Sequence, residues 1–372
     1  MAGASEITAM RRAVELAGRG AATASPNPVV GCVVLAPSGE TVGEGWHERP
    51  GGPHAEVAAL RRAGPAARGA TAVVTLEPCR HTGRTGPCTT ALLEAGVARV
   101  VYAVPDPSDQ AGGGAAVLAA AGVEVEAGVL RAEAEQVNAR WLAAARLGRP
   151  HVTWKFAGTL DGRSAAADGS SRWITGPEAR ADVHRLRAGM DAVVVGVGTV
   201  LADDPALTVR GVHPPPARPP LRVVVDSAGR TPSTARVLDA EAPTWVATTA
   251  ELGSDAAGRV PLAAVVYGLR ARGVLAALLE GGPTLAGAFV RAGLVDRVVG
   301  YVAPALLGAG AAVLGEAGVA SIDGAHRLVL DDVTLLGTDL RLTGSFARRP
   351  HQPAHPSGTA GASEEESTCS PG

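Results

Sequence analysis

A histidine, a glutamate and two cysteines in a fixed order constrain this chain of 372 residues more than any other feature. They form His54-Ala55-Glu56, Pro78-Cys79 and Pro87-Cys88. One imidazole and two thiolates fill three positions of a tetrahedral zinc ion and leave the fourth for water, as in catalytic zinc sites. Such an ion lowers the pKa of its bound water toward neutrality. We therefore expect His54, Cys79 and Cys88 to be zinc ligands and Glu56 to carry protons.

The spacing of these residues also predicts local structure. Residues two apart do not share a helix face, so His54 and Glu56 can reach one ion only at the end of a helix that begins near Glu56. Cys88 begins a second predicted helix, and a helix N-terminus lowers the pKa of a thiol. The pattern is typical of zinc-dependent deaminases of nucleobases, in which the glutamate is the acid and base. A structural cysteine knuckle or unrelated core thiols would leave Glu56 unexplained.

Composition restricts the substrates and the compartment. The net charge of -2 provides no basic surface for a nucleic acid, so we expect small-molecule substrates. No apolar run is long enough to span a membrane, and the first twenty residues predict an amphipathic helix without a signal-peptide core, which favours the cytoplasm. Cys32 lies in an apolar strand and Cys369 in a polar segment, so no disulfide framework is expected.

The first 147 residues alternate predicted helices and strands. After the N-terminal helix, Ser25-Pro26-Asn27-Pro28 predicts an extended turn that leads into a buried strand over 29–34. A strand over 72–76 delivers the first cysteine, a helix is expected over 115–121, and a short strand over 122–125 precedes a helix through Arg146. Asn27 and His47 can be ordinary loop residues on this evidence alone.

A second domain begins after Leu147-Gly148-Arg149-Pro150, where glycine and proline interrupt the helix. Residues 152–157 alternate as a strand, and 191–199 form a valine-rich strand ending in Gly-x-Gly-Thr. Leu201 replaces the third glycine of a dinucleotide fingerprint, so a Rossmann fold is not inferred. The strand, glycine turn and helix over 275–285 suit a cofactor phosphate or an ordinary connection. We predict domains at 1–147 and 151–346, and a disordered tail at 347–372.

Several motifs together resemble the RibD family of bifunctional riboflavin-biosynthesis enzymes. They are PNPVVG, GEGWH, HAEVAAL and TLEPCRHTGRTGPC, followed by the landmarks of the second domain in the same order. Eight residues separate Cys79 from Cys88, whereas cytidine deaminases usually place two between these cysteines. The resemblance covers about 340 residues. It implies an α/β fold: an N-terminal cytidine-deaminase-like zinc domain, followed by a C-terminal dihydrofolate-reductase-like domain that uses NADPH.

For the first domain, the resemblance implies zinc-dependent deamination of 2,5-diamino-6-ribosylamino-4(3H)-pyrimidinone 5′-phosphate. The implied substrate contacts are Asn27, His47, Arg84 and Asp106. Arg84 suits the phosphate, because a guanidinium binds phosphate bidentately, although it can also be a solvated loop charge. Two positions depart from the family pattern: Gly86 stands where a proline is expected, and Ser108 where an asparagine is expected.

For the second domain, the resemblance implies NADPH-dependent reduction of the ribosyl side chain of 5-amino-6-(5-phosphoribosylamino)uracil to ribityl. The implied NADPH contacts are Ala157, Trp173, Thr199, Ser227, Gly282, Pro283, Thr284 and Leu285. The implied substrate contacts are Ser171, Arg187, Asp203, Leu207, Arg210 and Glu280. By analogy with other NADP sites, Ser227 and Arg230 suit the 2′-phosphate. Lys155 and Asp161 are weaker candidates for shaping the site, and the family implies a homo-oligomer.

Three other functions explain part of the pattern. A single-activity deaminase would have a second domain without catalysis, and NADPH oxidation that depends on the deaminated intermediate distinguishes it. A tRNA-editing deaminase would need a basic groove, and an RNA gel-shift tests for one. A non-catalytic zinc-binding interaction protein leaves Glu56 beside an open coordination position unexplained.

Overall fold

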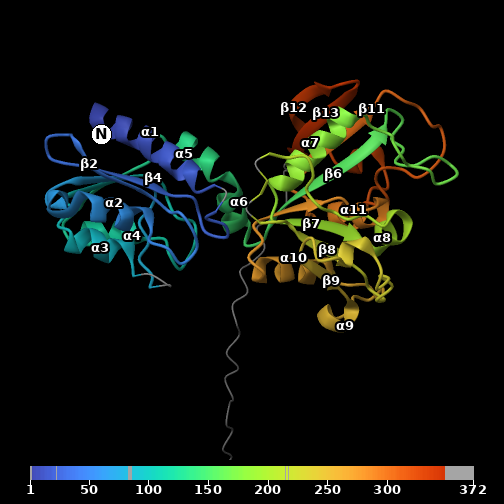
Figure 1. Cartoon of the computed structure of the whole chain (residues 1–372), viewed down its shortest axis with the longest axis horizontal. Helices are drawn as coiled ribbons and strands as arrows, with labels where there is room; N and C mark the ends of the chain where they lie inside the picture. Colours follow the sequence, from blue (N-terminus) through green and yellow to red (C-terminus); the bar gives the residue numbers. More distant parts are fainter. Residues whose placement is uncertain (1, 22, 83–85, 214, 217, 348–372) are drawn as a thin grey trace, which may run out of the picture.

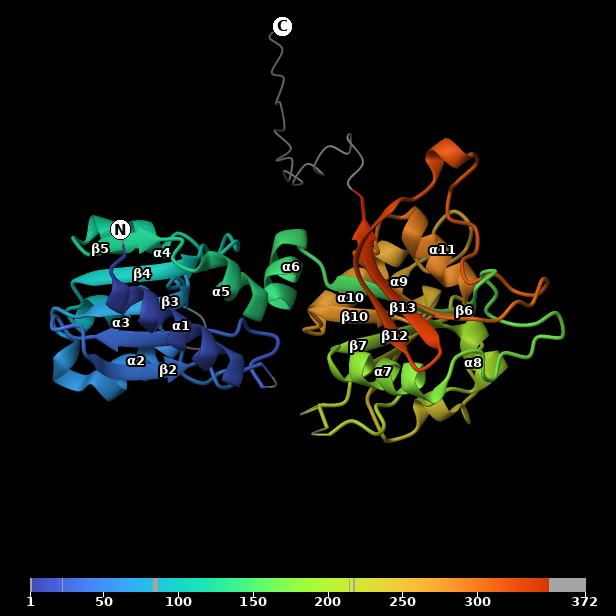
Figure 2. The ribbon, with the colours of Figure 1, turned by 90° about the horizontal axis from the view of Figure 1, so that it is seen from above.

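The chain forms two lobes, each built on its own sheet (Figures 1 and 2). The computed structural model describes residues 2–21, 23–82, 86–213, 215–216 and 218–347. Arg84, Cys369 and the predicted tail beyond residue 347 lie outside these ranges. Within them, no helix has the length and apolar character that crossing a membrane would require.

The first lobe has a five-stranded mixed sheet with helices on both faces (Figure 1). The strand order is β2-β1-β3-β4-β5, with β1 antiparallel to β2 and β3, and β3, β4 and β5 parallel. The strands are β1 (Gly31–Leu35), β2 (Thr41–Trp46), β3 (Thr71–Leu76), β4 (Arg99–Val104) and β5 (Glu124–Ala127). Helices α1 (Ala4–Arg19) and α5 (Arg131–Val137) cover one face, and α2 (Ala55–Ala63), α3 (Cys88–Glu94) and α4 (Gly114–Ala120) cover the other.

Glycines let α2 lie directly on the sheet. A Cβ at Gly45 would come within 2.4 Å of the Ala55 carbonyl oxygen, and one at Gly43 within 2.3 Å of the Ala59 carbonyl oxygen. No larger side chain fits at either position without moving the helix. This close packing fixes the N-terminal end of α2, where His54 and Glu56 lie.

The structure differs from two of the elements predicted for the first lobe, and Asn138 is involved in both differences. The strand predicted over 29–34 begins at Gly31, because the Val29 amide donates to Asn138 Oδ1 at 3.2 Å and does not join the ladder. The predicted single helix through Arg146 is divided into α5 and α6 (Ala139–Leu147) at Asn138, which is buried. The polar side chain of Asn138 thus ties the helix junction to the Asn27 turn.

The second lobe has an eight-stranded sheet of order β12-β13-β11-β6-β10-β7-β8-β9. The strands are β6 (His151–Thr159), β7 (Ala192–Gly196), β8 (Leu221–Val225), β9 (Thr244–Ala247), β10 (Ala276–Leu279), β11 (Arg297–Ala303), β12 (Leu328–Leu336) and β13 (Asp339–Phe346). The helices are α7 (Pro177–Ala188), α8 (Val197–Asp203), α9 (Thr249–Leu252), α10 (Leu262–Ala271) and α11 (Pro283–Arg291). From β11 to β9 the strands are parallel, and β12 and β13 form an antiparallel hairpin at one edge.

Valine-rich strands explain why this sheet is covered on both faces. Val193 and Val195 of β7 pack with Val200 of α8, whereas Val194 of the same strand packs toward α10 and α11. A parallel strand buried on both sides has no polar alternation, as the sequence of residues 192–195 indicates. This arrangement places the carboxyl ends of β7 and β10 beside the N-termini of α8 and α11.

Candidate active sites

The three predicted zinc ligands meet at one point in the first lobe. His54 stands at the N-cap position of α2, Cys79 follows β3, and Cys88 is the first residue of α3. Their ligand atoms all lie within 4.8 Å of one another, and His54 Nδ1 is 3.0 Å from Cys88 Sγ and 3.5 Å from Cys79 Sγ. These separations and the nitrogen and sulfur donors fit a tetrahedral zinc ion. Two helix ends face the site, as the spacing predicts.

Hydrogen bonding and burial shift the pKa values of the two cysteines and of Glu56 in different directions. Hydrogen bonds from Cys88 and from His54 lower the pKa of Cys79 below its usual value, which favours the thiolate. The pKa of Cys88 is not lowered as its place at a helix N-terminus predicted: the hydrogen bond with Cys79 and burial raise it, and Cys88 shares its proton with the neighbouring thiolate. Glu56 lies in the first turn of α2 and is only 4% exposed, and this burial raises the pKa of its carboxyl. A carboxyl with a raised pKa exchanges protons more readily near neutral pH.

Asn27 and His47 lie together next to the metal ligands. Asn27 Nδ2 and His47 Nε2 are 3.1 Å apart, and His47 Nδ1 is 3.1 Å from the Pro53 carbonyl oxygen. Because a ring nitrogen that faces a carbonyl carries the proton, Nε2 is the acceptor for the Asn27 amide. The His47 and His54 rings are 5.6 Å apart between centroids. These contacts orient two polar side chains that the sequence alone left as loop residues.

Asp106 follows β4 and lies in a turn that Ser108 closes. Asp106 Oδ1 accepts hydrogen bonds from the Ser108 amide at 2.9 Å and from Ser108 Oγ at 2.6 Å. The Ala111 amide donates to Ser108 Oγ at 3.3 Å. Burial raises the pKa of Asp106. Ser108 therefore supports the loop through its hydroxyl group.

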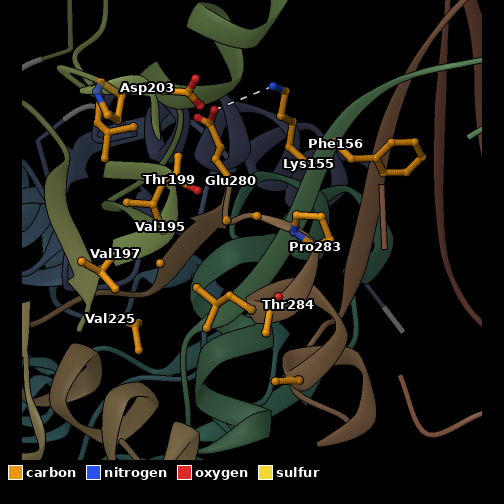
Figure 3. A pocket seen from close by; sticks show the side chains of 18 of the residues that line it. Lys155, Phe156, Val195, Val197, Thr199, Asp203, Val225, Glu280, Pro283 and Thr284 are labelled. Atoms are coloured by element: carbon orange, nitrogen blue, oxygen red, sulfur yellow. Dashed lines mark ion pairs between the residues drawn. The ribbon is translucent and has the colours of Figure 1, made fainter. Parts of the chain in front are cut away.

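In the second lobe, the residues predicted to bind NADPH and substrate line one cavity of about 2470 Å³. It contains every one of them: Ala157, Ser171, Trp173, Arg187, Thr199, Asp203, Leu207, Arg210, Ser227, Glu280, Gly282, Pro283, Thr284 and Leu285. Figure 3 shows Lys155 reaching from β6 toward Glu280, while Thr284 and Val225 lie further from this pair. The cavity lies beyond the carboxyl ends of the parallel strands, where α/β proteins bind ligands.

A buried group of three charges lies in this cavity. Arg187 binds Glu280 through two hydrogen bonds, of 2.5 and 2.9 Å, and Lys155 Nζ is 3.8 Å from Glu280 Oε2. Burial raises the pKa of Glu280, but Arg187 and Lys155 outweigh it and lower the pKa to about 2. Arg187 also donates to the Thr208 carbonyl at 3.1 Å and so holds the loop of Leu207. Glu280 thus stays ionised at neutral pH and organises two cations.

We expect that, in Glu280→Gln, the free energy of unfolding of the reductase lobe changes less with pH in the acid range than in the wild type. The folded-state pKa is lowered from 4.5 to about 2, so the ionised group stabilises the fold above about pH 4.5 and loses this effect as pH falls toward 2. The wild-type advantage over Glu280→Gln should shrink by about 3 kcal/mol over that range. Urea unfolding at several pH values tests this, with the exposed Glu241→Gln as control; a gap that does not change with pH contradicts it.

Other residues of the cavity carry no assignment from sequence. His184 Nδ1 accepts the Arg210 amide at 3.2 Å, and burial lowers the pKa of His184, which keeps its ring neutral. Arg236 and Arg259 also line the cavity and add positive charge to it. His184 could have been assigned from the motif His184-Arg185-Leu186-Arg187, because residues three apart share a helix face and Arg187 was already predicted to bind substrate.

The described residues contain no second group of three metal-ligating side chains. Asp161 binds Thr159 Oγ1 at 2.5 Å and the Gly308 amide at 2.7 Å, and it does not line the cavity. Its role is to close a turn. Of the two weaker candidates, only Lys155 therefore faces the cavity.

Comparisons with known proteins agree with this division. Residues 4–104 match the cytidine and deoxycytidylate deaminase zinc-binding region, and residues 150–342 match the RibD C-terminal domain. The riboflavin biosynthesis protein RibD of Mycobacterium tuberculosis is 51% identical over 342 residues, which cover 90% of this chain and 96% of that protein. RibD of Escherichia coli K12 is 46% identical over 325 residues, which cover 81% of this chain and 88% of that protein. A solved structure of Acinetobacter baumannii RibD is 41% identical in sequence and has a TM-score of 0.80. The match covers 92% of this chain and 99% of that one.

Fold and sites together define a two-domain enzyme with a zinc-dependent deaminase domain followed by a reductase domain that uses a nicotinamide cofactor. These matches cover most of this chain and most of each relative. The chain belongs to the RibD family.

Proposed function

We propose that the chain catalyses two successive steps of riboflavin biosynthesis on a phosphorylated pyrimidine. The first is deamination of 2,5-diamino-6-ribosylamino-4(3H)-pyrimidinone 5′-phosphate, and the second is NADPH-dependent reduction of the ribosyl side chain of 5-amino-6-(5-phosphoribosylamino)uracil. A solved Thermotoga maritima relative, 33% identical, is described as a diaminohydroxyphosphoribosylaminopyrimidine deaminase and 5-amino-6-(5-phosphoribosylamino)uracil reductase. The convergence of His54, Cys79 and Cys88 beside buried Glu56 is the observation that carries the proposal.

In the deaminase site, this chain's residues hold the metal, orient the ring and move protons. Zinc, when bound by His54, Cys79 and Cys88, supplies an activated water. Glu56 would accept a proton at its carboxylate and return it to the departing amine. Asn27 and His47 hold the pyrimidine edge, and Asp106 contributes from the loop after β4. Arg84 would meet the phosphate in this proposal, and it lies outside the described residues.

In the reductase site, the protein mainly positions two ligands. NADPH supplies the hydride when bound. Ala157, Trp173 and Thr199, with Ser227 and the turn from Gly282 to Leu285, would hold the cofactor. Ser171, Arg187, Asp203, Leu207, Arg210 and Glu280 would hold the substrate. The cations suit the phosphate, the carboxylates suit sugar hydroxyls, and Lys155 beside Glu280 shapes the same end of the cavity.

A coupled assay tests the proposal. Purified protein with the diaminopyrimidinone ribosyl phosphate should release ammonia without NADPH, and NADPH loss should require the deaminated intermediate. Ammonia without subsequent NADPH oxidation would indicate a deaminase alone. If neither signal appears although zinc is bound, the proposed substrate is wrong.

We expect Arg230→Ala to reduce the preference for NADPH over NADH by roughly 10- to 100-fold in kcat/KM, because a guanidinium bond to a phosphate contributes about 1.5–3 kcal/mol. Arg230 lines the cavity beside Ser227, whose Oγ accepts the Val260 amide at 3.0 Å. Initial rates with each cofactor measure the preference. Arg270→Ala, an exposed arginine of α10 outside the cavity, is the control. An unchanged preference in Arg230→Ala would refute this assignment.

We also propose that the protein is a homo-oligomer that pairs through β12. This strand is at the sheet edge, and its Val329, Val333 and Leu335 are 56%, 55% and 66% exposed. Long apolar edge strands invite pairing with a second chain. Leu335→Lys should lower the mass measured by sedimentation from dimer or higher to monomer, whereas Leu201→Lys, an exposed leucine of α8, should not. A wild-type monomer at micromolar concentration would contradict the proposal.

A further inference from the structure

Glu77 is a buried carboxylate that neither the metal site nor the mechanism uses. It lies between β3 and the ligand Cys79 and is only 7% exposed. Within the part of the chain that the structure describes, no ion pair involves Glu77. Its partners are three backbone amides, of Asp106 at 3.1 Å, Gly113 at 3.0 Å and Ala115 at 2.9 Å. A buried charge is costly unless its hydrogen bonds are satisfied, so these three bonds are what keep it there.

The three amides belong to the two ends of one loop. Asp106 begins the segment that follows β4, and Gly113 and Ala115 lie where that segment enters α4. Glu77 Oε2 binds the first end and Glu77 Oε1 binds the second. One carboxylate therefore closes the loop of residues 106–113 at its base.

The same loop also packs on the turn that carries Cys79. A Cβ at Gly114 would come within 1.8 Å of the Pro78 carbonyl oxygen, so the two backbones are in direct contact. The Arg80 amide donates to the Ala111 carbonyl at 3.2 Å, and Ala111 is buried with the two cysteines. The position of Asp106 relative to the zinc ligands thus depends on how this loop is held.

We infer that Glu77 is a positioning residue of the deaminase, which fixes the loop of Asp106 against the zinc-ligand turn. The inference rests on the proposed deamination, in which Asp106 meets the substrate. Its physical basis is that a carboxylate can accept at both oxygens, whereas an amide can accept at only one. In Glu77→Gln, either orientation of the amide places an NH₂ group against a backbone N–H at one end of the loop, and that end is released.

The test is Glu77→Gln in the full-length zinc-loaded chain. The loss of a hydrogen bond to a charged group corresponds to a change of roughly 10- to 100-fold in an equilibrium constant. We expect the deaminase KM to rise by roughly this factor, with a smaller change in kcat. Zinc content should stay at the wild-type level, and the reductase kcat/KM on supplied deaminated substrate should not change. Glu6→Gln is the matched control: Glu6 binds Arg99, at the opposite, amino ends of the parallel strands, and should leave KM unchanged.

Two further measurements separate positioning from a general structural role. If Glu77 acts through Asp106, adding Glu77→Gln to Asp106→Ala should raise KM little further, because the two effects are then not additive. Amide hydrogen exchange should increase in residues 106–115 of Glu77→Gln and stay at the wild-type rate in β3 and α2. Additive KM effects, unchanged exchange in the loop, or loss of zinc or of the folded chain in Glu77→Gln would each overturn the inference. If the wild type releases no ammonia, the proposed function fails, and the exchange measurement still tests Glu77.

Discussion

Replacing Glu56 by glutamine is expected to reduce ammonia release by about 10³- to 10⁴-fold, which is the upper range for the loss of a general acid and base. Glutamine keeps the size of the side chain, but it can neither take a proton from water nor return one to the amine. Glu56 is 4% exposed at the start of α2, so bulk water cannot easily replace it. The measurement is steady-state ammonia release, with zinc content determined on the same sample.

The reductase domain provides an internal control for this variant. Its core residues form clusters separate from those of the first lobe, so the rate on supplied deaminated intermediate should equal that of the wild type. Glu94→Gln, at the exposed end of α3, should retain ammonia release. A loss below about 10-fold in Glu56→Gln would show that another group moves the proton.

Replacing Cys79 by alanine is expected to abolish both zinc binding and deamination. Changes to groups that only orient metal ligands cost about 10- to 100-fold in affinity, so removal of a ligand should cost more. The Cys79 sulfur is within hydrogen-bonding distance of His54 Nδ1 and of the Cys88 amide, at 3.5 and 3.4 Å. Zinc per chain after gel filtration is the primary readout, and reductase activity should persist.

Cys32→Ala is the matched control for this experiment. Cys32 is also fully buried, in β1, and burial raises the pKa of its thiol well above the usual value. It is not part of the ligand group, so its alanine variant should bind zinc like the wild type. Zinc retained in Cys79→Ala, or lost in Cys32→Ala, would show that the ligand set is different.

Most elements around the sites follow from local patterns. The helix starts at Ala55 and Cys88 agree with the spacing of the metal ligands, and β3, β7 and β10 agree with runs of apolar residues. The division of the last helix at Asn138 was not predictable. Its cause is a hydrogen bond to Val29, 109 residues away, and no local pattern contains such a partner.

Arg222 is a second example of a tertiary effect. An arginine in a strand predicts a solvent-facing position, yet Arg222 of β8 is fully buried. It donates to Asp239 Oδ1 at 2.7 Å and to Thr244 Oγ1 at 2.9 Å, and also to the Ala206 carbonyl at 3.3 Å. Segments distant in sequence cover the strand and supply these acceptors, so only the folded chain decides that this charge is internal.

Residue types at short, fixed spacings are enough to predict the candidate ligand set, the proton carrier and the order of the two domains. The tertiary structure alone decided that Glu77 closes the loop of Asp106 and that His184 supports Arg210. It also decided that Arg187, Lys155 and Glu280 form one charged group. The residues that meet in these contacts are up to about 125 positions apart along the chain, so they come together only when the strands align. Burial then sets the strength of each contact.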